Sequence, residues 1–168
     1  RRRTWRRFVN KNKILNMLIG HGWDLHQHSK DEKLILGGVK FDEDGFTGHS
    51  DGDILLHALC DGLLGATGKK DLGYYFPSND STPKNIPSTE ILTEVLNIIE
   101  YQNLKLINLD ITIVTQKFNV QEKADKIQES LSNLLNISKD LLNIKGKSSD
   151  DYGLIGDEKA SLAIVSLL

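Results

Sequence analysis

The chain has 168 residues, of which 39% are hydrophobic and 26% charged, and its formal net charge is −2. This length suits one globular domain that buries roughly 68–70% of its unfolded surface without disulfide staples. A single cysteine, Cys60, rules out an intramolecular disulfide framework. No stretch approaches the roughly 20 apolar residues that span a bilayer. Disulfide-rich, collagen-like and integral membrane classes are therefore excluded.

Charge is distributed unevenly along the chain. All five arginines lie within residues 1–7, whereas residues 14–168 carry 14 lysines against 23 acidic residues, a net charge of −9. An Arg-rich, acid-poor segment is typical of an organelle transit peptide. Residues 1–15 are therefore expected to be a basic leader or transit-peptide remnant, and residues 16–168 the functional domain. A solvated tail and a nucleic-acid arm are the other interpretations of this leader.

The composition also bears on location and partners. A plastid-type organelle, apicoplast or chloroplast, is the expected location, with the bacterial cytoplasm as the alternative. The acidic body opposes general nucleic-acid binding because its carboxylates would repel a phosphate backbone. Since it also lacks an apolar span, the chain is expected to bind neither nucleic acid nor membrane.

The first predicted elements of the domain are two strands. An apolar run from residue 13 predicts a strand that ends near Gly22. A second strand is expected over residues 33–41, where the Gly37-Gly38 pair indicates a bulge or a close backbone approach. The polar residues 42–48 are interpreted as a loop.

A helix and a long loop come next. Apolar residues at helical spacing predict a helix that is capped by Ser50 or Asp51 and ends near Gly65 or Gly68. Residues 71–87 contain all three prolines and form the one long irregular segment. Such loops in compact domains are often functional.

The second half alternates helices and strands. A helix over 88–103 is expected to be capped by Ser88 or Thr89, and its successors are a strand over 104–116, a helix over 119–137, a strand over 141–148, a turn over 149–158 and a strand over 159–168. The last two strands are joined by a short link. This order favours an α+β fold in which a mixed β-sheet carries helices on one face.

Histidines and carboxylates indicate a metal site. Asp24 and His26 point to the same side of a strand because strand side chains alternate, and His57 on the first helix could supply a third ligand. Three such ligands match a zinc site with an open fourth position. The alternative is a polar surface edge with one structural histidine. His28 and His21 are assigned to that alternative.

Two further features surround this cluster. Asp53, His57 and Asp61 are spaced i, i+4 and i+8 and would share a helix face, so either carboxylate could orient the ring of a ligating histidine. Residues 48–53 directly precede the helix, where backbone amides can hold phosphate and His49 and Ser50 can add donors. A simple helix cap with loop glycines is the alternative interpretation of this segment.

Several motifs in a fixed order indicate a family. They are IGHGWDLH (19–26), GHSDGDILLHALCDGLLGA (48–66), DLGYYFPSND (71–80), LDITIV (109–114) and IKGKSSDDYGLIG (144–156). From about residue 17 to the end, the chain resembles the 2-C-methyl-D-erythritol 2,4-cyclodiphosphate synthases of non-mevalonate isoprenoid biosynthesis. The resemblance implies a homotrimer with active sites at subunit interfaces. The implied reaction converts 4-diphosphocytidyl-2-C-methyl-D-erythritol 2-phosphate, a cytidylyl substrate, to the cyclodiphosphate with release of CMP.

The resemblance also implies roles for individual residues. Asp24, His26 and His57 would bind one Zn²⁺ per active site, and Asp150 would ligate a second ion, Mg²⁺ or Mn²⁺, on the substrate diphosphate. His49 and Ser148 match positions that stabilise the transition state. The remaining positions would contact the substrate; they are Ser50, Asp71, Gly73, Phe76, Asp80, Thr115, Lys147 and Ser149.

Some residues depart from the family pattern. Asp150 replaces a glutamate, Ser148 a threonine, and Asp157 stands where an arginine is frequent. Lys147 stands where a threonine is usual, and residues 117–120 differ from the usual run near the cytosine pocket. These departures leave two alternatives to the cyclising lyase: a non-catalytic trimer that binds metal and phosphate, and a zinc phosphohydrolase.

Overall fold

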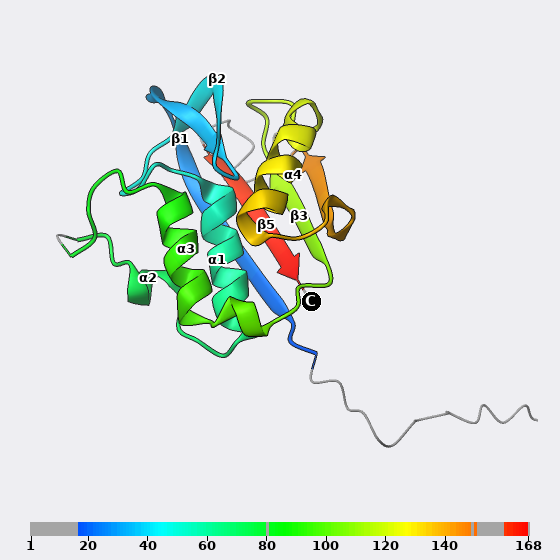
Figure 1. Cartoon of the computed structure of the whole chain (residues 1–168). Helices are drawn as coiled ribbons and strands as arrows, with labels where there is room; N and C mark the ends of the chain where they lie inside the picture. Colours follow the sequence, from blue (N-terminus) through cyan, green and yellow to red (C-terminus); the bar gives the residue numbers. More distant parts are fainter. Residues whose placement is uncertain (1–16, 80, 149, 151–159, 168) are drawn as a thin grey trace, which may run out of the picture.

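The computed structural model describes residues 17–79, 81–148 and 150, together with the backbone of residues 160–167 (Figure 1). The expected leader over 1–15 lies outside the described residues. The same holds for two proposed substrate contacts, Asp80 and Ser149, for the predicted turn over 149–158 except Asp150, and for the Asp157 departure.

A five-stranded mixed sheet forms the centre of the molecule, in the order β2-β1-β5-β3-β4. Its neighbouring strands are antiparallel except for the parallel pair β3–β4. The strands are β1 (Gly20–Leu36), β2 (Val39–Phe46), β3 (Leu109–Val114), β4 (Leu142–Lys147) and β5 (Ala160–Leu167). The sheet therefore agrees with the predicted α+β class.

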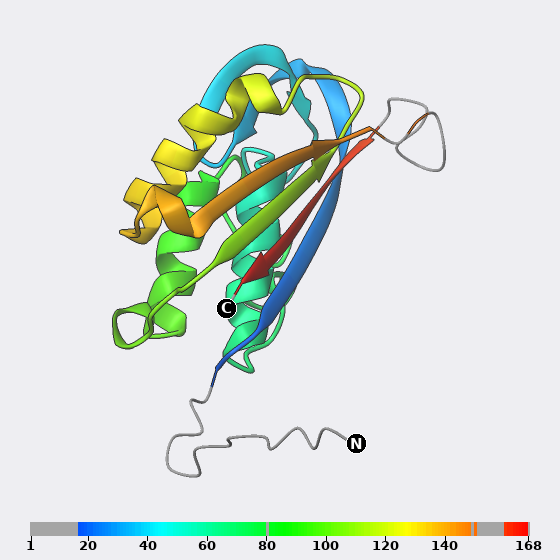
Figure 2. The same cartoon turned by 90° about the vertical axis from the view of Figure 1, so that its right-hand side faces the viewer.

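Helices cover one face of this sheet, as Figure 2 shows from the side. They are α1 (Ile54–Ala66), α2 (Leu72–Tyr75), α3 (Ser88–Ile98) and α4 (Gln121–Leu135), with short 3₁₀ turns η1 (Tyr101–Asn103) and η2 (Lys139–Leu141). The main core lies between the two layers. Alternate residues Leu109, Ile111 and Ile113 of β3 are fully buried there, as are Ile127 and Leu131 of α4, as the periods of two and 3.6 require.

The start of the domain differs from the sequence prediction. The strand expected to end near Gly22 instead begins at Gly20 and continues to Leu36, and most of the expected loop 42–48 belongs to β2. Gly37 and Gly38 form a two-residue turn rather than a bulge, with φ of 60° and 78°. Left-handed backbone at both positions matches the twist of a tight hairpin. Because this hairpin is mostly polar and partly exposed, apolar periodicity did not reveal it.

Helix starts also differ from the prediction. The cap of α1 is Asp53, rather than Ser50 or Asp51, and its carboxylate accepts from the amides of Leu55 and Leu56. Helix α3 follows Pro87 without a side-chain cap, because the Ser88 hydroxyl is turned toward other partners. The end of α1 agrees with the prediction: the helix was expected to end near Gly65 or Gly68, and it ends at Ala66.

Gly22 sets the distance between β1 and α1. A Cβ atom built there would lie 2.0 Å from the Ala58 carbonyl oxygen and 2.6 Å from the Gly62 nitrogen. Only glycine allows so close an approach of strand and helix. Since side chains two residues apart share a strand face, Asp24 and His26 point to this same helix side. This contact brings β1 side chains within reach of His57.

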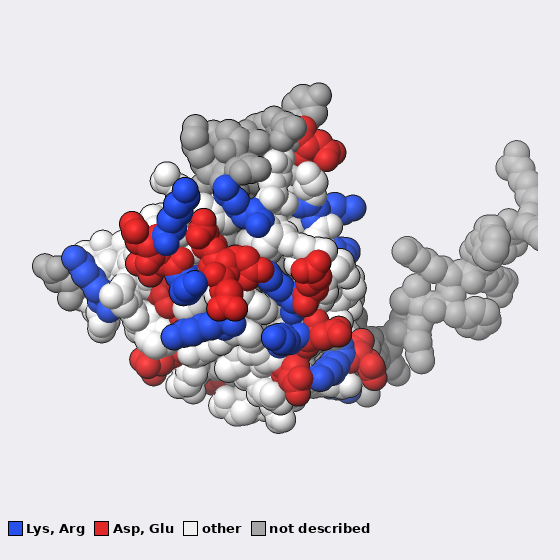
Figure 3. All heavy atoms as spheres, turned by 90° about the horizontal axis from the view of Figure 1, so that it is seen from above, with Lys and Arg blue, Asp and Glu red and all other residues white. Residues whose placement is uncertain are grey.

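The two remaining features are the distribution of surface charge and the lack of a membrane-spanning helix among the described residues. Seen from above, the described basic side chains are interspersed with acidic ones (Figure 3). Among the described residues, no helix is both long enough and apolar enough to cross a membrane.

Candidate functional site

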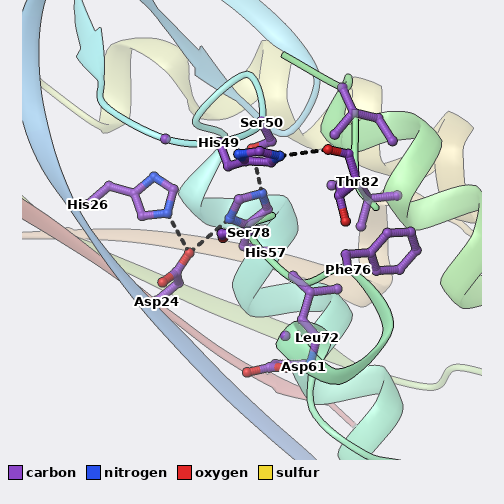
Figure 4. Close-up of a pocket in the computed structure, with 14 residues that line it drawn as sticks. Asp24, His26, His49, Ser50, His57, Asp61, Leu72, Phe76, Ser78 and Thr82 are labelled. Carbon is purple, nitrogen blue, oxygen red and sulfur yellow. Dashed lines mark hydrogen bonds and ion pairs between the residues drawn. The ribbon is translucent and has the colours of Figure 1, made fainter. Parts of the chain in front are cut away.

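Asp24, His26 and His57 meet as the sequence predicted (Figure 4). The Asp24 Oδ2 atom lies 2.9 Å from His26 Nε2 and 3.0 Å from His57 Nδ1. One ligand atom from each residue lies within 4.8 Å of the other two. A carboxylate oxygen and two imidazole nitrogens that converge in this way fit a zinc ion, with room for a fourth ligand.

The electrostatics of Asp24 also suit a cation. Burial acts to raise the pKa of this carboxyl, but hydrogen bonds and charge interactions with His26 and His57 outweigh it and hold the pKa well below its usual range. Asp24 is therefore ionised at neutral pH and can offer a negative oxygen to a metal. The side chains of the three residues are between 13% and 29% exposed, so the cluster is accessible from one side.

Asp53 does not orient His57, which corrects the sequence interpretation. One oxygen of its fully buried carboxylate accepts from Leu55 and Leu56, and the other accepts from the Gly38 amide at 2.7 Å. Burial raises the pKa of Asp53 to about 6. Asp53 does not share a helix face with His57, because it precedes the helix as its cap. Its carboxylate therefore joins α1 to the hairpin turn.

Asp61 likewise supports backbone rather than the His57 ring. Its Oδ1 accepts from the Leu72 amide at 2.7 Å and so fixes the start of α2. Burial is the main cause of its raised pKa. The residue also lines the pocket described below, with its carboxylate near the metal cluster.

The partners of the His57 Nε2 atom are two hydroxyl groups. Ser50 Oγ lies 3.0 Å away and Ser88 Oγ 3.1 Å away. The sequence indicated Ser50 only as a substrate contact and Ser88 only as a helix cap. Since Ser88 is 31 residues from His57, no local spacing could have shown this contact.

A pocket of about 370 Å³ opens beside the metal cluster. Its walls come from β1, from the segment before α1, from α2 and from the long loop that was expected to be functional. Predicted site residues that line it are Asp24, His26, His49, Ser50, His57, Asp61, Gly73 and Phe76. His49 Nε2 lies 2.7 Å from the Thr82 carbonyl oxygen, which holds its ring at the pocket wall. This volume is within the range of small-molecule sites.

The expected phosphate cradle of backbone amides before α1 is largely occupied. The Asp51 amide donates to the Ile86 carbonyl, the Gly52 amide to Ser50 Oγ and the Asp53 amide to Asp51. Any phosphate here would therefore depend on side chains and on a bound metal more than on the helix start.

The other predicted site residues that the structure describes lie outside this pocket. Asp71 caps α2 by accepting from the Tyr74 amide at 2.9 Å. The Thr115 amide donates to the Lys147 carbonyl where β3 and β4 end. Just beyond, Ser148 Oγ accepts from the Asp150 amide at 3.0 Å, and both residues are exposed. The predicted site is therefore divided between the metal pocket and the β3–β4 ends.

These features define an α+β domain with a candidate metal centre in a small-molecule pocket. The family model described as "YgbB family" matches residues 17–168. A relative from Fusobacterium nucleatum subsp. nucleatum, named 2-C-methyl-D-erythritol 2,4-cyclodiphosphate synthase, is 42% identical over 141 residues, covering 83% of this chain and 88% of its own. A relative of the same name from Hydrogenobaculum sp. is 43% identical over 150 residues, covering 89% and 94%. The chain belongs to the YgbB family, so the resemblance stated from the motifs is confirmed.

Solved structures agree with this assignment. A structure described as 2C-methyl-D-erythritol-2,4-cyclodiphosphate synthase matches with a TM-score of 0.80 at 31% identity, covering 89% of this chain and 98% of that one. A structure described as IspF from Plasmodium falciparum in a CDP complex matches with a TM-score of 0.77 at 32% identity, covering 89% and 93%. The fold is therefore that of this family along most of the chain.

Proposed function

We propose that the chain converts 4-diphosphocytidyl-2-C-methyl-D-erythritol 2-phosphate to 2-C-methyl-D-erythritol 2,4-cyclodiphosphate and releases CMP, within non-mevalonate isoprenoid biosynthesis. The observation that carries the proposal is the convergence of Asp24, His26 and His57 beside a pocket of about 370 Å³, in a chain whose relatives carry the synthase name. The CDP described for a solved neighbour supports a cytidylyl ligand.

The proposed chemistry needs little from protein acids or bases. The nucleophile is a phosphate oxygen of the substrate and is already anionic at neutral pH, so no general base is required. The barrier comes from repulsion between phosphoryl groups and from charge in the transition state, so catalysis consists of positioning and electrostatic stabilisation. A divalent ion, when bound, supplies positive charge to the phosphoryl oxygens.

The residues of the chain then have distinct tasks. Asp24, His26 and His57 would hold Zn²⁺, and Asp150 would ligate Mg²⁺ or Mn²⁺. His49 is proposed to lie beside a phosphoryl oxygen at the pocket wall, where its Nε2 atom donates to the Thr82 carbonyl and so fixes the ring. Asp61 would keep α2, and with it the proposed substrate contact at Gly73, in place. Ser148 would stabilise the transition state with its hydroxyl.

We further propose a homotrimer, with Ser148 and Asp150 contributed to the pocket of a neighbouring subunit. One support is their location outside the pocket of their own chain. The other is an exposed apolar side chain on the sheet face opposite the helices. Trp23 on that face is 60% exposed, although large apolar side chains usually find cover. Trp23→Glu is expected to yield a smaller species in sedimentation velocity, with Tyr74→Glu, at a similarly exposed aromatic residue on α2, as the control. A Trp23→Glu chain that sediments like the unmodified protein would contradict this interface.

The proposed location is a plastid-type organelle, supported by the basic composition of residues 1–15. Immunofluorescence of the endogenous protein is expected to place it in that organelle in cells of the source organism. Uniform cytoplasmic fluorescence would contradict targeting.

The test of the reaction is to incubate the purified chain with the cytidylyl substrate and divalent metal. Phosphorus NMR is expected to show CMP and a cyclic diphosphate in equal amounts. A linear phosphate product would instead indicate a zinc phosphohydrolase. Binding without turnover after metal reconstitution would indicate a non-catalytic trimer.

A further inference from the structure

The outer support of His57 is a buried Asp51–Ser88 pair. The Ser88 side chain is fully buried, and its Oγ lies 2.5 Å from Asp51 Oδ1 and 3.1 Å from His57 Nε2. The other oxygen of Asp51 accepts from the Ser88 amide at 3.0 Å. Asp51 thus holds Ser88 by both its backbone and its side chain. The sequence indicated Asp51 and Ser88 only as possible helix caps and not as supports of His57.

The direction of these hydrogen bonds follows from chemistry. An ionised carboxylate only accepts hydrogen bonds, and a serine hydroxyl has one hydrogen to give. The Ser88 hydrogen is therefore directed to Asp51. Toward His57, Ser88 Oγ is left as an acceptor, so His57 Nε2 must be the donor. Nδ1 lies 3.0 Å from Asp24 Oδ2, an oxygen that only accepts. Nδ1 therefore either donates to Asp24 or, with a metal between them, offers that metal an electron pair, while Nε2 keeps its hydrogen on Ser88.

We propose that Asp51 and Ser88 are positioning residues that fix the His57 tautomer so that Nδ1 is available to a metal. This inference rests on the proposed metal-binding role of His57. Partners of this kind orient a ligating ring, and their loss typically weakens metal binding about 10- to 100-fold. In many metal sites a carboxylate bonds directly to the ligating histidine. Here the Ser88 hydroxyl lies between the Asp51 carboxylate and His57.

Ser50 cannot supply the same constraint. Its Oγ also lies near His57 Nε2, but the group it is seen to bind is the Gly52 amide, a donor. The hydrogen of the Ser50 hydroxyl is therefore not committed by that contact, and Ser50 can either accept from His57 or donate to it. Only Ser88 has its hydrogen directed to a carboxylate in this cluster of described residues.

The experiment compares three variants of the full chain. Zn²⁺ affinity is measured by competition with a chromophoric chelator, and the presence of a hydrogen on His57 Nε2, with and without Zn²⁺, by nitrogen-15 NMR. Ser88→Ala is expected to weaken Zn²⁺ binding about 10- to 100-fold. Thr93→Ala, at an exposed hydroxyl of the same helix, is expected to change Zn²⁺ affinity less than about twofold.

Asp51→Asn separates tautomer control from simple support. An amide can still accept from the Ser88 backbone, but its NH₂ group then faces Ser88 Oγ and donates to it. The Ser88 hydrogen turns to His57 Nε2, and the His57 hydrogen moves to Nδ1. We expect Asp51→Asn to lose the hydrogen on His57 Nε2 and to bind Zn²⁺ more weakly than the unmodified chain.

The outcomes are distinguishable. The proposal is overturned if His57 Nε2 of the unmodified protein carries no hydrogen, a result that needs no variant to fold. It is also overturned if Ser88→Ala and Asp51→Asn, shown to be folded by circular dichroism, bind Zn²⁺ like the unmodified chain. Unmodified chain that binds no Zn²⁺ but has the Nε2–H tautomer would contradict the proposed metal site and leave the hydrogen-bond relay supported.

Discussion

Replacing Gly22 by alanine should separate β1 from α1 and so disturb the metal cluster. The added Cβ would lie 2.0 Å from the Ala58 carbonyl oxygen, whereas real contacts of this kind are essentially never under 3.0 Å. Strand and helix must therefore separate by about 1 Å, and overpacking of this kind costs about 1–3 kcal/mol. The same shift exceeds the roughly 0.5 Å tolerance of a functional constellation, and it acts on a 3.0 Å contact between Asp24 and His57.

The assay for Gly22→Ala combines urea unfolding with Zn²⁺ titration. We expect an unfolding free energy lower by about 1–3 kcal/mol and weaker Zn²⁺ binding at urea concentrations where the variant is still folded. Gly65→Ala on α1 is the matched control, because a Cβ atom added at Gly65 would have no neighbour within 4 Å. Alanine there is expected to add up to about 1 kcal/mol of stability. Unchanged stability and Zn²⁺ affinity in Gly22→Ala would refute the reasoning.

Two further predictions concern buried charges. Burial raises the pKa of Asp53 from 3.8 to about 6, so the folded state binds this proton more tightly and loses stability as pH rises from 4 to 6. Relative to Asp53→Asn, which does not titrate, the loss should be on the order of 3 kcal/mol in urea unfolding across that range; parallel curves would contradict it. Glu43→Ala removes the ion-pair partner of Lys123, whose side chain is only 8% exposed. It should cost about 3 kcal/mol in thermal or urea unfolding, and a cost under about 0.5 kcal/mol would contradict this.

The metal cluster was predictable because two simple periods produce it. Strand alternation places Asp24 and His26 on one side, and this holds although β1 continues well beyond the predicted end of the strand. His57 lies on a helix whose apolar spacing was clear. The contact between these elements depends on Gly22, whose role follows from backbone distances that the sequence does not contain.

The supports of the cluster were not predictable from spacing. Asp53 was assigned to a helix face because it lies four residues before His57, but it caps the helix and its oxygens face backbone amides. Ser88 was assigned to a cap, but its hydroxyl binds Asp51. In both cases a short polar side chain had several possible partners, and tertiary packing decided between them.

The hairpin and the division of the site between two regions were not predictable from the sequence, for two different reasons. Polar residues of β1 and β2 face solvent at the hairpin, so the alternation that usually indicates strands is weak there. The segment with Ser148 and Asp150 lies away from the pocket of its own chain. A pattern along one chain indicates no contacts between chains, so spacing could not bring these residues together with the metal cluster.

The most direct test of the account is CMP release by His57→Ala beside the unmodified chain, with the metal content of both samples measured. We expect the unmodified chain to release CMP with bound divalent metal. The folded variant should lose the metal and at least about 100-fold of the rate, the equivalent of about 2.7 kcal/mol of transition-state stabilisation. A folded His57→Ala protein that releases CMP at the unmodified rate would contradict the central claim.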